Sequence, residues 1–174
     1  MRRFIMLSEK LIEEINLQIK YEFFSAHLYL SMASFCADND LPGFENWFTI
    51  QAEEERFHAM KFYNYLTSKG AKTVITGFED PKADFKDILD CFSFGLEHEK
   101  FVTSRIYHLM DIAQDEREYA TISMLNWFID EQVEEEESFN NIIAQLKFMG
   151  VSSDIVYRLD RELAVRVFTP PAVK

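Results

Sequence analysis

The sequence predicts an all-α fold: a four-helix bundle with a long crossover between the second and third helices and a short fifth helix at the C-terminal end. Apolar residues recur at helical spacing through four long stretches. Most of the five glycines and four prolines lie between these stretches. A chain of 174 residues, 48% of them hydrophobic, can form one sizeable core. We therefore expect a single domain over residues 1–174.

Capping and turn residues predict where each helix begins and ends. Ser8 is a good N-cap for the first helix, and the segment 38–43, which contains Pro42 and Gly43, ends it. Gly70 ends the second helix and Gly150 the fourth. The expected helices cover residues 8–37, 44–69, 84–113, 118–149 and 153–165, the last capped by Ser152 or Ser153.

The lengths of the links predict the topology of the bundle. The first and third links are short, so the helices that they join form antiparallel hairpins. Residues 71–84, when nearly extended, reach roughly 45 Å. A helix of 26 residues measures roughly 39 Å. The middle link can therefore run the length of the bundle and place the third helix parallel to the second.

Charge and cysteine content restrict the class of partner. Thirty acidic residues against 18 basic ones give a formal net charge of −12, which repels nucleic acids and anionic membranes and favours cations. Cys36 and Cys91 lie in apolar helical stretches without zinc-ligand spacing, so we expect reduced thiols. The N-terminal segment becomes polar too early for a secretory signal, and apolar runs are too short for a membrane span. We expect a soluble, cytoplasmic protein.

One residue spacing occurs twice in the chain. A lone glutamate is followed 33 residues later by a polar pair whose members are three residues apart. Each of these residues interrupts the apolar stripe of its helix near the middle, where a bundle assembles a dinuclear metal site from facing side chains. The first copy consists of Glu22, Glu55 and His58, and the second of Glu99, Gln132 and Glu135.

Carboxylates on inward faces predict a metal centre. Four buried glutamates would repel one another strongly without a cation. Carboxylate oxygen with a single imidazole suits iron or manganese and also admits zinc, whereas the lack of inward thiolates argues against an iron–sulfur cluster. Carboxylates can bridge two ions, and their charge favours the ferric state. The pattern indicates chemistry with dioxygen.

Residues beside the stripe leave several alternatives open. Gln132 can bind metal directly, donate to a bound water or peroxide, or orient Glu135; we favour the two indirect roles. Tyr29, two turns beyond Glu22, can donate an electron or simply pack in the core. Three further glutamates just off the stripe form either a satellite metal site or a solvated face: Glu54, Glu131 and Glu134.

Other histidines and one tryptophan have simpler interpretations. His27, His98 and His108 have no partner in the repeated spacing, so we assign them structural or surface roles. Trp127 precedes the acidic run of the fourth helix, where we expect a core role.

Four segments resemble the non-haem ferritins of the bacterial type, and the resemblance extends over residues 6–165. It implies a ferritin-like fold, a hollow homo-oligomeric cage of 24 subunits, and a ferroxidase centre in each subunit. The segments are Tyr21–Phe24, Glu53–Met60, Glu97–Glu99 and Trp127–Glu136.

Specific metal ligands follow from this resemblance. It implies that Glu22, Glu55 and His58 hold a first iron, and that Glu55, Glu99 and Glu135 hold a second, with Glu55 bridging and Gln132 close by. A third iron would be held by Glu54, Glu131 and Glu134, with Glu135 shared. Tyr29 matches a redox-active tyrosine of the family and Trp127 the tryptophan near it.

Two departures separate the chain from related families. Bacterioferritins have a haem-ligating methionine after the bridging glutamate and a histidine where Glu135 stands; Arg56 occupies the first position here, so we expect no haem. Animal ferritins have acids in their threefold channels at the positions of Ile122 and Leu125, so iron uptake by that acidic route is not expected here.

The predicted function is iron storage and detoxification. A ferroxidase would oxidise Fe(II) with dioxygen or hydrogen peroxide, and the cage would store the ferric oxide mineral. The alternative is a slow metal-sequestration cage without rapid ferroxidase activity, which the complete ligand set argues against. A metal-free structural bundle is a further alternative. So is an oxidase of organic substrates, for which 174 residues leave little chain for a pocket.

Overall fold

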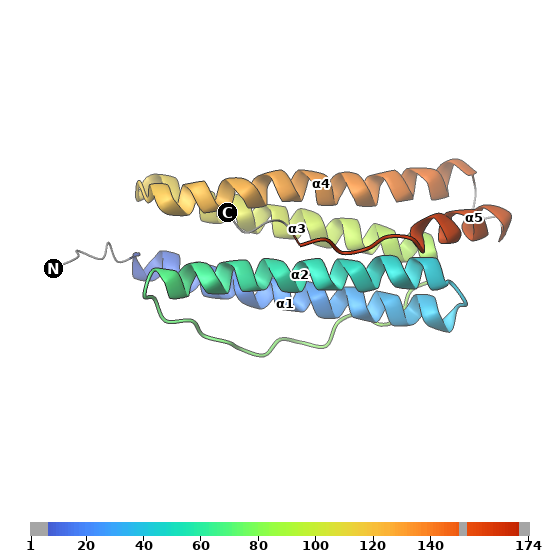
Figure 1. Cartoon of the computed structure of the whole chain (residues 1–174), viewed down its shortest axis with the longest axis horizontal. Coiled ribbons are helices and arrows are strands. Elements are labelled where there is room, and N and C mark those ends of the chain that lie inside the picture. Colours follow the sequence, from blue (N-terminus) through green and yellow to red (C-terminus); the bar gives the residue numbers. More distant parts are fainter. Residues whose placement is uncertain (1–6, 150–152, 171–174) are drawn as a thin grey trace.

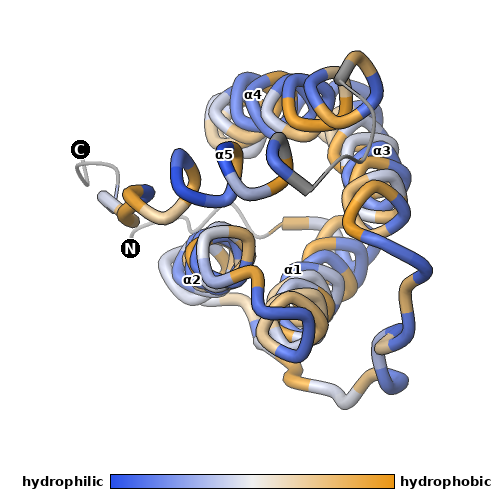
Figure 2. The backbone as a smooth tube through the Cα atoms, turned by 90° about the vertical axis from the view of Figure 1, so that its right-hand side faces the viewer, coloured by the Kyte–Doolittle hydropathy of each residue, from blue (hydrophilic) through white to orange (hydrophobic). Residues whose placement is uncertain are grey.

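The computed structural model describes residues 7–149 and 153–170 and confirms the all-α fold class, with a long crossover between the second and third helices (Figure 1). Four long helices lie side by side, and a short fifth helix crosses one end of the bundle (Figure 2). In the described part of the chain, no helix is long and apolar enough to cross a membrane. The helices are α1 (Glu9–Asp38), α2 (Pro42–Ser68), α3 (Ile88–Asp115), α4 (Tyr119–Met149) and α5 (Ser153–Leu163).

Tight turns make the two hairpins antiparallel. The Ser8 side chain caps α1 by accepting a hydrogen bond from the Leu11 amide at 3.0 Å. Asp40 and Arg117 adopt positive φ angles of 56° and 55° in the α1–α2 and α3–α4 turns. Gly70, at φ 70°, follows α2, where a left-handed residue ends a helix at least steric cost.

The crossover between α2 and α3 runs along the outside of the bundle beside α1 (Figure 1). Asn16 of α1 donates to the Lys72 carbonyl at 3.0 Å and accepts from the Val74 amide at 2.7 Å. Further along α1, Ser31 donates to the Lys82 carbonyl at 2.9 Å. The crossover is longer than predicted, because α3 begins at Ile88 rather than near residue 84. Asp87 is its N-cap and accepts from the Asp90 amide at 2.8 Å.

A residue of α5 caps the start of α2. The side chain of Asp160 accepts from the amides of Gly43 and Phe44 at 2.7 and 3.0 Å. A Cβ atom at Gly43 would lie 1.6 Å from the Asp160 carbonyl oxygen, so only glycine permits this approach. We predicted that α2 begins at Phe44; it begins at Pro42, because its cap comes from another helix. Ser152, one of the two predicted caps of α5, lies outside the described residues.

The core consists of two apolar regions with a polar layer between them. The distal core, near α5, is built from residues such as Phe48, Phe92 and Phe139. The proximal core, at the other end, includes Phe62 and Phe128, whose rings stack at a centroid distance of 4.0 Å. The layer between the two regions contains buried polar residues from all four long helices: Gln18, Glu22, Ser25, Gln51, Glu55, His58, Glu99, Gln132 and Glu135.

Candidate metal centre

All six residues of the repeated spacing lie in the polar layer. None is more than 5% exposed, so their charges are removed from water. Each long helix supplies at least one of them: Glu22 from α1, Glu55 and His58 from α2, Glu99 from α3, and Gln132 and Glu135 from α4.

Two groups of side chains are close enough to hold a metal ion. Glu22, Glu55 and His58 each offer one ligand atom, and these atoms lie within 4.8 Å of one another. His58, Glu131 and Glu135 form a second such group. His58 joins the two, with Nδ1 3.7 Å from Glu55 Oε2 and Nε2 3.7 Å from Glu131 Oε1. His58 therefore belongs to both groups, whereas the predicted second set of Glu55, Glu99 and Glu135 does not form such a group among the described residues.

Two buried carboxylate oxygens have no hydrogen-bond partner in the described part of the chain. Glu22 Oε2 and Glu55 Oε2 accept no hydrogen bond from any described residue. Burying an unpaired anionic oxygen is costly, and a cation between these groups would remove the cost. The hard oxygen donors with one imidazole fit iron, manganese or zinc.

Burial raises the pKa of every carboxyl group in the layer. Desolvation is the main cause at Glu22 and Glu135, whose pKa values lie well above the usual range, and a neighbouring carboxylate raises each further. Desolvation raises the pKa of Glu55 and takes that of Glu99 to about 7, against hydrogen bonds from Tyr29 and Gln132 that lower it. Without metal, the layer therefore retains protons near neutral pH.

His58 has the opposite balance of causes. Burial alone would lower its pKa, but contacts with the carboxylates of Glu131, Glu55 and Glu22 raise it well above the ordinary value. A protonated His58 would neutralise part of the acidic layer in the metal-free protein. Metal binding must displace this proton, because imidazole ligates only in its neutral form.

Three amide side chains fix the orientation of the carboxylates. Gln18 donates to Glu22 Oε1 at 2.8 Å, and Gln51 donates to Glu135 Oε2 at 2.5 Å. Gln132 donates to Glu99 Oε2 at 3.1 Å, so its amide nitrogen orients Glu99 and not Glu135. Sequence analysis missed Gln18 and Gln51. Each lies four residues before a predicted ligand, on the same helix face, which is the signal that could have identified them.

The three satellite glutamates do not form a ligand group among the described residues. Glu131 contacts His58, whereas Glu134 is exposed. Glu54 accepts a hydrogen bond from Arg166 at 2.5 Å. Burial raises the pKa of Glu54, and the charges of Glu131 and Glu134 raise it further, against the Arg166 charge.

Aromatic residues border the centre. Tyr29 is fully buried and donates its hydroxyl to Glu99 Oε1. The Trp127 ring lies 5.5 Å from the His58 ring, centroid to centroid. The other histidines belong to neither ligand group: His98 contacts Ser25 at the edge of the layer at 2.7 Å, and His27 and His108 are exposed.

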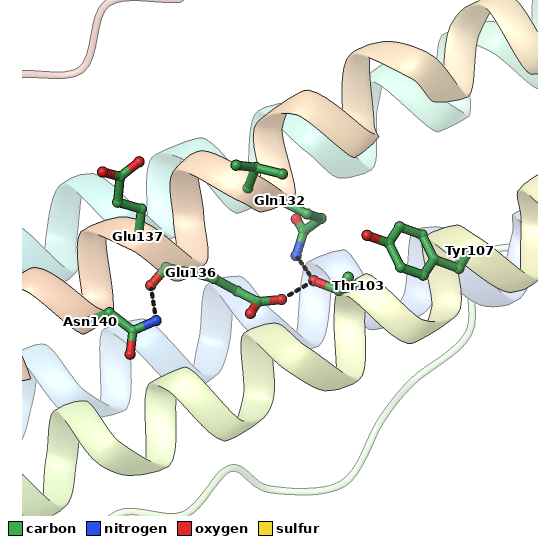
Figure 3. Close-up of a pocket in the computed structure, with 7 residues that line it drawn as sticks. Thr103, Tyr107, Gln132, Glu136, Glu137 and Asn140 are labelled. Atoms are coloured by element: carbon green, nitrogen blue, oxygen red, sulfur yellow. Dashed lines mark hydrogen bonds between the residues drawn. The ribbon is translucent and has the colours of Figure 1, made fainter.

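A surface cavity of about 400 Å³ lies between α3 and α4 (Figure 3). Gln132 forms part of its wall, and Thr103 accepts from Gln132 and donates to Glu136 at 2.6 Å. Gln132 therefore separates the Glu99 carboxylate from a polar surface pocket.

A four-helix bundle with carboxylates and a histidine in one buried layer defines the class of metal-carboxylate bundle proteins. Comparison with known families agrees, because residues 12–149 match the Ferritin family, described as a ferritin-like domain. The chain belongs to the ferritin family.

Sequence identity to individual relatives indicates which type of ferritin the chain is. The chain is 45% identical over 163 residues to bacterial non-heme ferritins of Staphylococcus saprophyticus and Staphylococcus aureus, covering 94% of this chain and 98% of each relative. An engineered closed form of the Archaeoglobus fulgidus ferritin superposes with a TM-score of 0.92 at 40% identity, covering 94% of this chain and 99% of that one. An open-pore ferritin of the same archaeon gives 0.91 at 39% identity, with 92% and 98% covered. Within its family the chain is of the bacterial non-haem type, and its function is iron storage.

Proposed function

We propose that the polar layer is a ferroxidase centre that binds two Fe(II) ions and oxidises them. The observation that carries this proposal is the convergence of glutamates from four helices and one histidine in a single buried layer, with two carboxylate oxygens that accept no hydrogen bond from the described residues. A structural network would satisfy its own polar groups.

The first iron takes Glu22, Glu55 and His58, whose ligand atoms already lie within 4.8 Å of one another. The second takes Glu55, Glu99 and Glu135, with Glu55 as the bridge. Each carboxylate oxygen has a second lone pair, so the hydrogen bonds from Gln51, Gln132 and Tyr29 leave room for metal. These hydrogen bonds hold the ligands in place.

The reaction transfers two electrons to the oxidant. Each Fe(II) gives one electron, dioxygen takes two electrons and two protons, and hydrogen peroxide leaves. With hydrogen peroxide as the oxidant, the same two electrons and two protons yield two waters. The carboxylates supply negative charge that favours Fe(III), and they lose their own protons when metal binds. When a third Fe(II) also reacts, Tyr29, whose hydroxyl donates to Glu99, is placed to give the fourth electron that, with four protons, reduces dioxygen to two waters.

A third iron belongs to the satellite position at Glu54, Glu131 and Glu134, beside Glu135. Ferric ions pass from the centre into the interior of a homo-oligomeric cage. The cage has 24 subunits, as the resemblance to bacterial-type non-haem ferritins implies. They are stored there as hydrated ferric oxide.

An anaerobic Fe(II) titration followed by a dioxygen pulse tests the proposal. A ferroxidase takes up dioxygen rapidly, at about one molecule per two Fe(II), and retains the iron on the protein. A slow sequestration cage, the alternative function, would retain iron with dioxygen uptake no faster than Fe(II) in buffer. That result would overturn the ferroxidase and leave storage intact.

A further inference from the structure

The segment after α5 returns along α2 toward the metal centre. In Figures 1 and 2, residues 164–170 leave the end of the bundle and lie between α2 and α4. The Asn46 side chain holds the start of this segment, donating to the carbonyls of Leu163 at the end of α5 and of Ala164 and Arg166, at 3.3, 3.4 and 3.0 Å. The position of this segment is therefore fixed by α2.

Side chains in this segment alternate between solvent and the bundle. Val165 and Val167 are 79% and 75% exposed. Arg166 and Phe168 point the other way: the Arg166 guanidinium lies 4.6 Å from the centre of the Trp47 ring, and the Phe168 ring lies 6.2 Å from that of Phe57. Val165 lies in a turn after α5, and Asn46 holds the carbonyl of Arg166 itself, so fixing the backbone also aims the Arg166 side chain at α2.

Arg166 binds three groups on one face of α2. Its Nη2 donates to Glu54 Oε2 at 2.5 Å, and its Nη1 donates to Gln51 Oε1 at 2.9 Å and to the Trp47 carbonyl at 3.2 Å. The side chains of Arg166 and Glu54 are 25% and 20% exposed, so solvent screens this ion pair only in part.

These contacts also determine the orientation of an amide in the metal centre. Guanidinium has donors only, so Gln51 must present its oxygen to Arg166 and its NH2 group to Glu135. The Gln51 nitrogen donates to Glu135 Oε2 at 2.5 Å, and Gln51 is fully buried. Arg166 is therefore two hydrogen bonds away from a proposed iron ligand.

We propose that Arg166 is a counter-cation of Glu54. Its guanidinium occupies the satellite metal position until a third metal ion displaces the guanidinium. Glu54 keeps free lone pairs for a metal ion, but the guanidinium charge neutralises its carboxylate and repels a second cation, so the ion pair weakens satellite binding. Arg166 is a positioning residue, and the proposal rests on the iron centre proposed above.

Zn(II) binding to the intact, metal-free assembly tests this competition, because Zn(II) accepts the same ligands and does not change oxidation state. Isothermal titration of the parent should show two tight ions per subunit and a weaker third. Arg166→Gln should tighten the third step about tenfold, an effect that Glu54→Gln in the same chain should abolish. Arg166→Lys, which keeps the charge, should stay close to the parent. Arg158→Gln, at an exposed arginine of α5, is the matched control.

The outcomes separate this proposal from the proposed function. If the parent lacks two tight sites, the metal centre itself is wrong. Two tight sites with a third step that is unchanged or weaker in Arg166→Gln would overturn the role of Arg166. Light scattering and thermal unfolding report whether each variant assembles. If Arg166→Gln does not assemble, Arg166→Met retains apolar contact with Trp47 and should show the same tightening.

Discussion

The apolar regions of the core and the polar layer between them respond to burial in opposite ways. In the distal and proximal cores, burial of residues such as Phe92 and Phe62 stabilises the fold. In the polar layer, burial of the ionised carboxylates destabilises it, which is why their pKa values rise: these are Glu22, Glu55, Glu99 and Glu135. The comparison indicates that the two ends stabilise the bundle and that the layer uses part of this stability to keep ligands ready for metal.

The largest expected effect comes from removing a ligand. Glu22→Ala or His58→Ala should slow Fe(II) oxidation by about 100-fold or more, since loss of a mere supporting contact to a metal ligand already costs 10- to 100-fold. The assembly should persist, because the apolar regions are untouched. Stopped-flow absorbance and light scattering measure the two effects. Glu137→Ala and His108→Ala, at exposed positions, are the controls. Rapid oxidation by both ligand variants would remove the layer from the reaction.

The reverse experiment changes a core region and leaves the layer alone. Phe92→Ala should lower the free energy of unfolding by about 3–5 kcal/mol, because the ring is fully buried among Phe44, Trp47 and Phe139. Two tight metal ions should still bind. Phe94 lies on the same helix and is 38% exposed, so Phe94→Ala should lower the free energy of unfolding by less than about 2 kcal/mol. Denaturant titration with metal counting checks both. If Phe92→Ala abolished metal binding, the regions would not be separable.

Protons sharpen the comparison through pH. A carboxyl group whose pKa is raised in the folded protein stabilises the fold below its unfolded pKa, near 4.5, and this contribution is lost as pH rises through the folded value. For Glu99, with a pKa of about 7, the loss is on the order of 3 kcal/mol between pH 5 and pH 8. The raised pKa of His58 acts in the same direction.

Metal-free protein should therefore unfold at a lower temperature at pH 8 than at pH 5, and added Zn(II) should reverse the difference. Glu99→Gln should be at least as stable as the parent at pH 8 without metal, since an amide keeps the volume and removes the charge. Gln132 can turn its amide to pair with it. Scanning calorimetry of both proteins at the two pH values is the measurement. A marked loss of stability in metal-free Glu99→Gln would mean that Glu99 stabilises the fold through its protein contacts.

The smallest effect is expected at the edge of the layer. Changing Glu131 and Glu134 together to alanine should reduce bound Fe(II) from three per subunit toward two and change the number of ions oxidised per dioxygen. The dinuclear reaction should continue. Because Glu131 also contacts His58, the Glu134→Ala single variant separates the satellite site from that contact. If the number of Fe(II) ions bound per subunit and oxidised per dioxygen were unchanged in the double variant, Glu131 and Glu134 would not be metal ligands.

Local patterns in the sequence predicted the polar layer, whereas contacts between distant segments were not predictable. Glu22, Glu55, Glu99 and Glu135 each interrupt an apolar stripe, and a stripe is visible within one helix. The Asp160 cap of α2 and the bond between Arg166 and Glu54 join residues more than 100 positions apart, and no periodicity encodes such pairs. Gly43 was predicted to lie in the link before α2 because its partner Asp160 is not apparent from the local sequence; it lies in the first turn of α2.

The start of α3 illustrates a smaller limit. Residues 84, 87 and 90 are all aspartates, and any of them is a plausible cap by type alone. Asp87 serves because the crossover, held by Asn16 and Ser31 of α1, delivers the chain to the bundle at that residue. The satellite glutamates Glu54, Glu131 and Glu134 were predicted from their positions just off the stripe and from the family resemblance. In the structure Glu54 is paired with Arg166, a residue that the sequence does not connect to α2.

The Asp160 cap has a consequence for the order in which a nascent subunit matures. Gly43 and its capping carboxylate are 117 residues apart, so ribosomes making roughly 5–20 residues per second synthesise the cap about 6–23 s after the first turn of α2 that it completes. During that interval α2 can pair with α1, but its first turn has unsatisfied amides. A residue made late in synthesis thus completes a helix that was made early. A subunit truncated before Asp160 would have its structural defect at the start of α2, far in sequence from the missing residues.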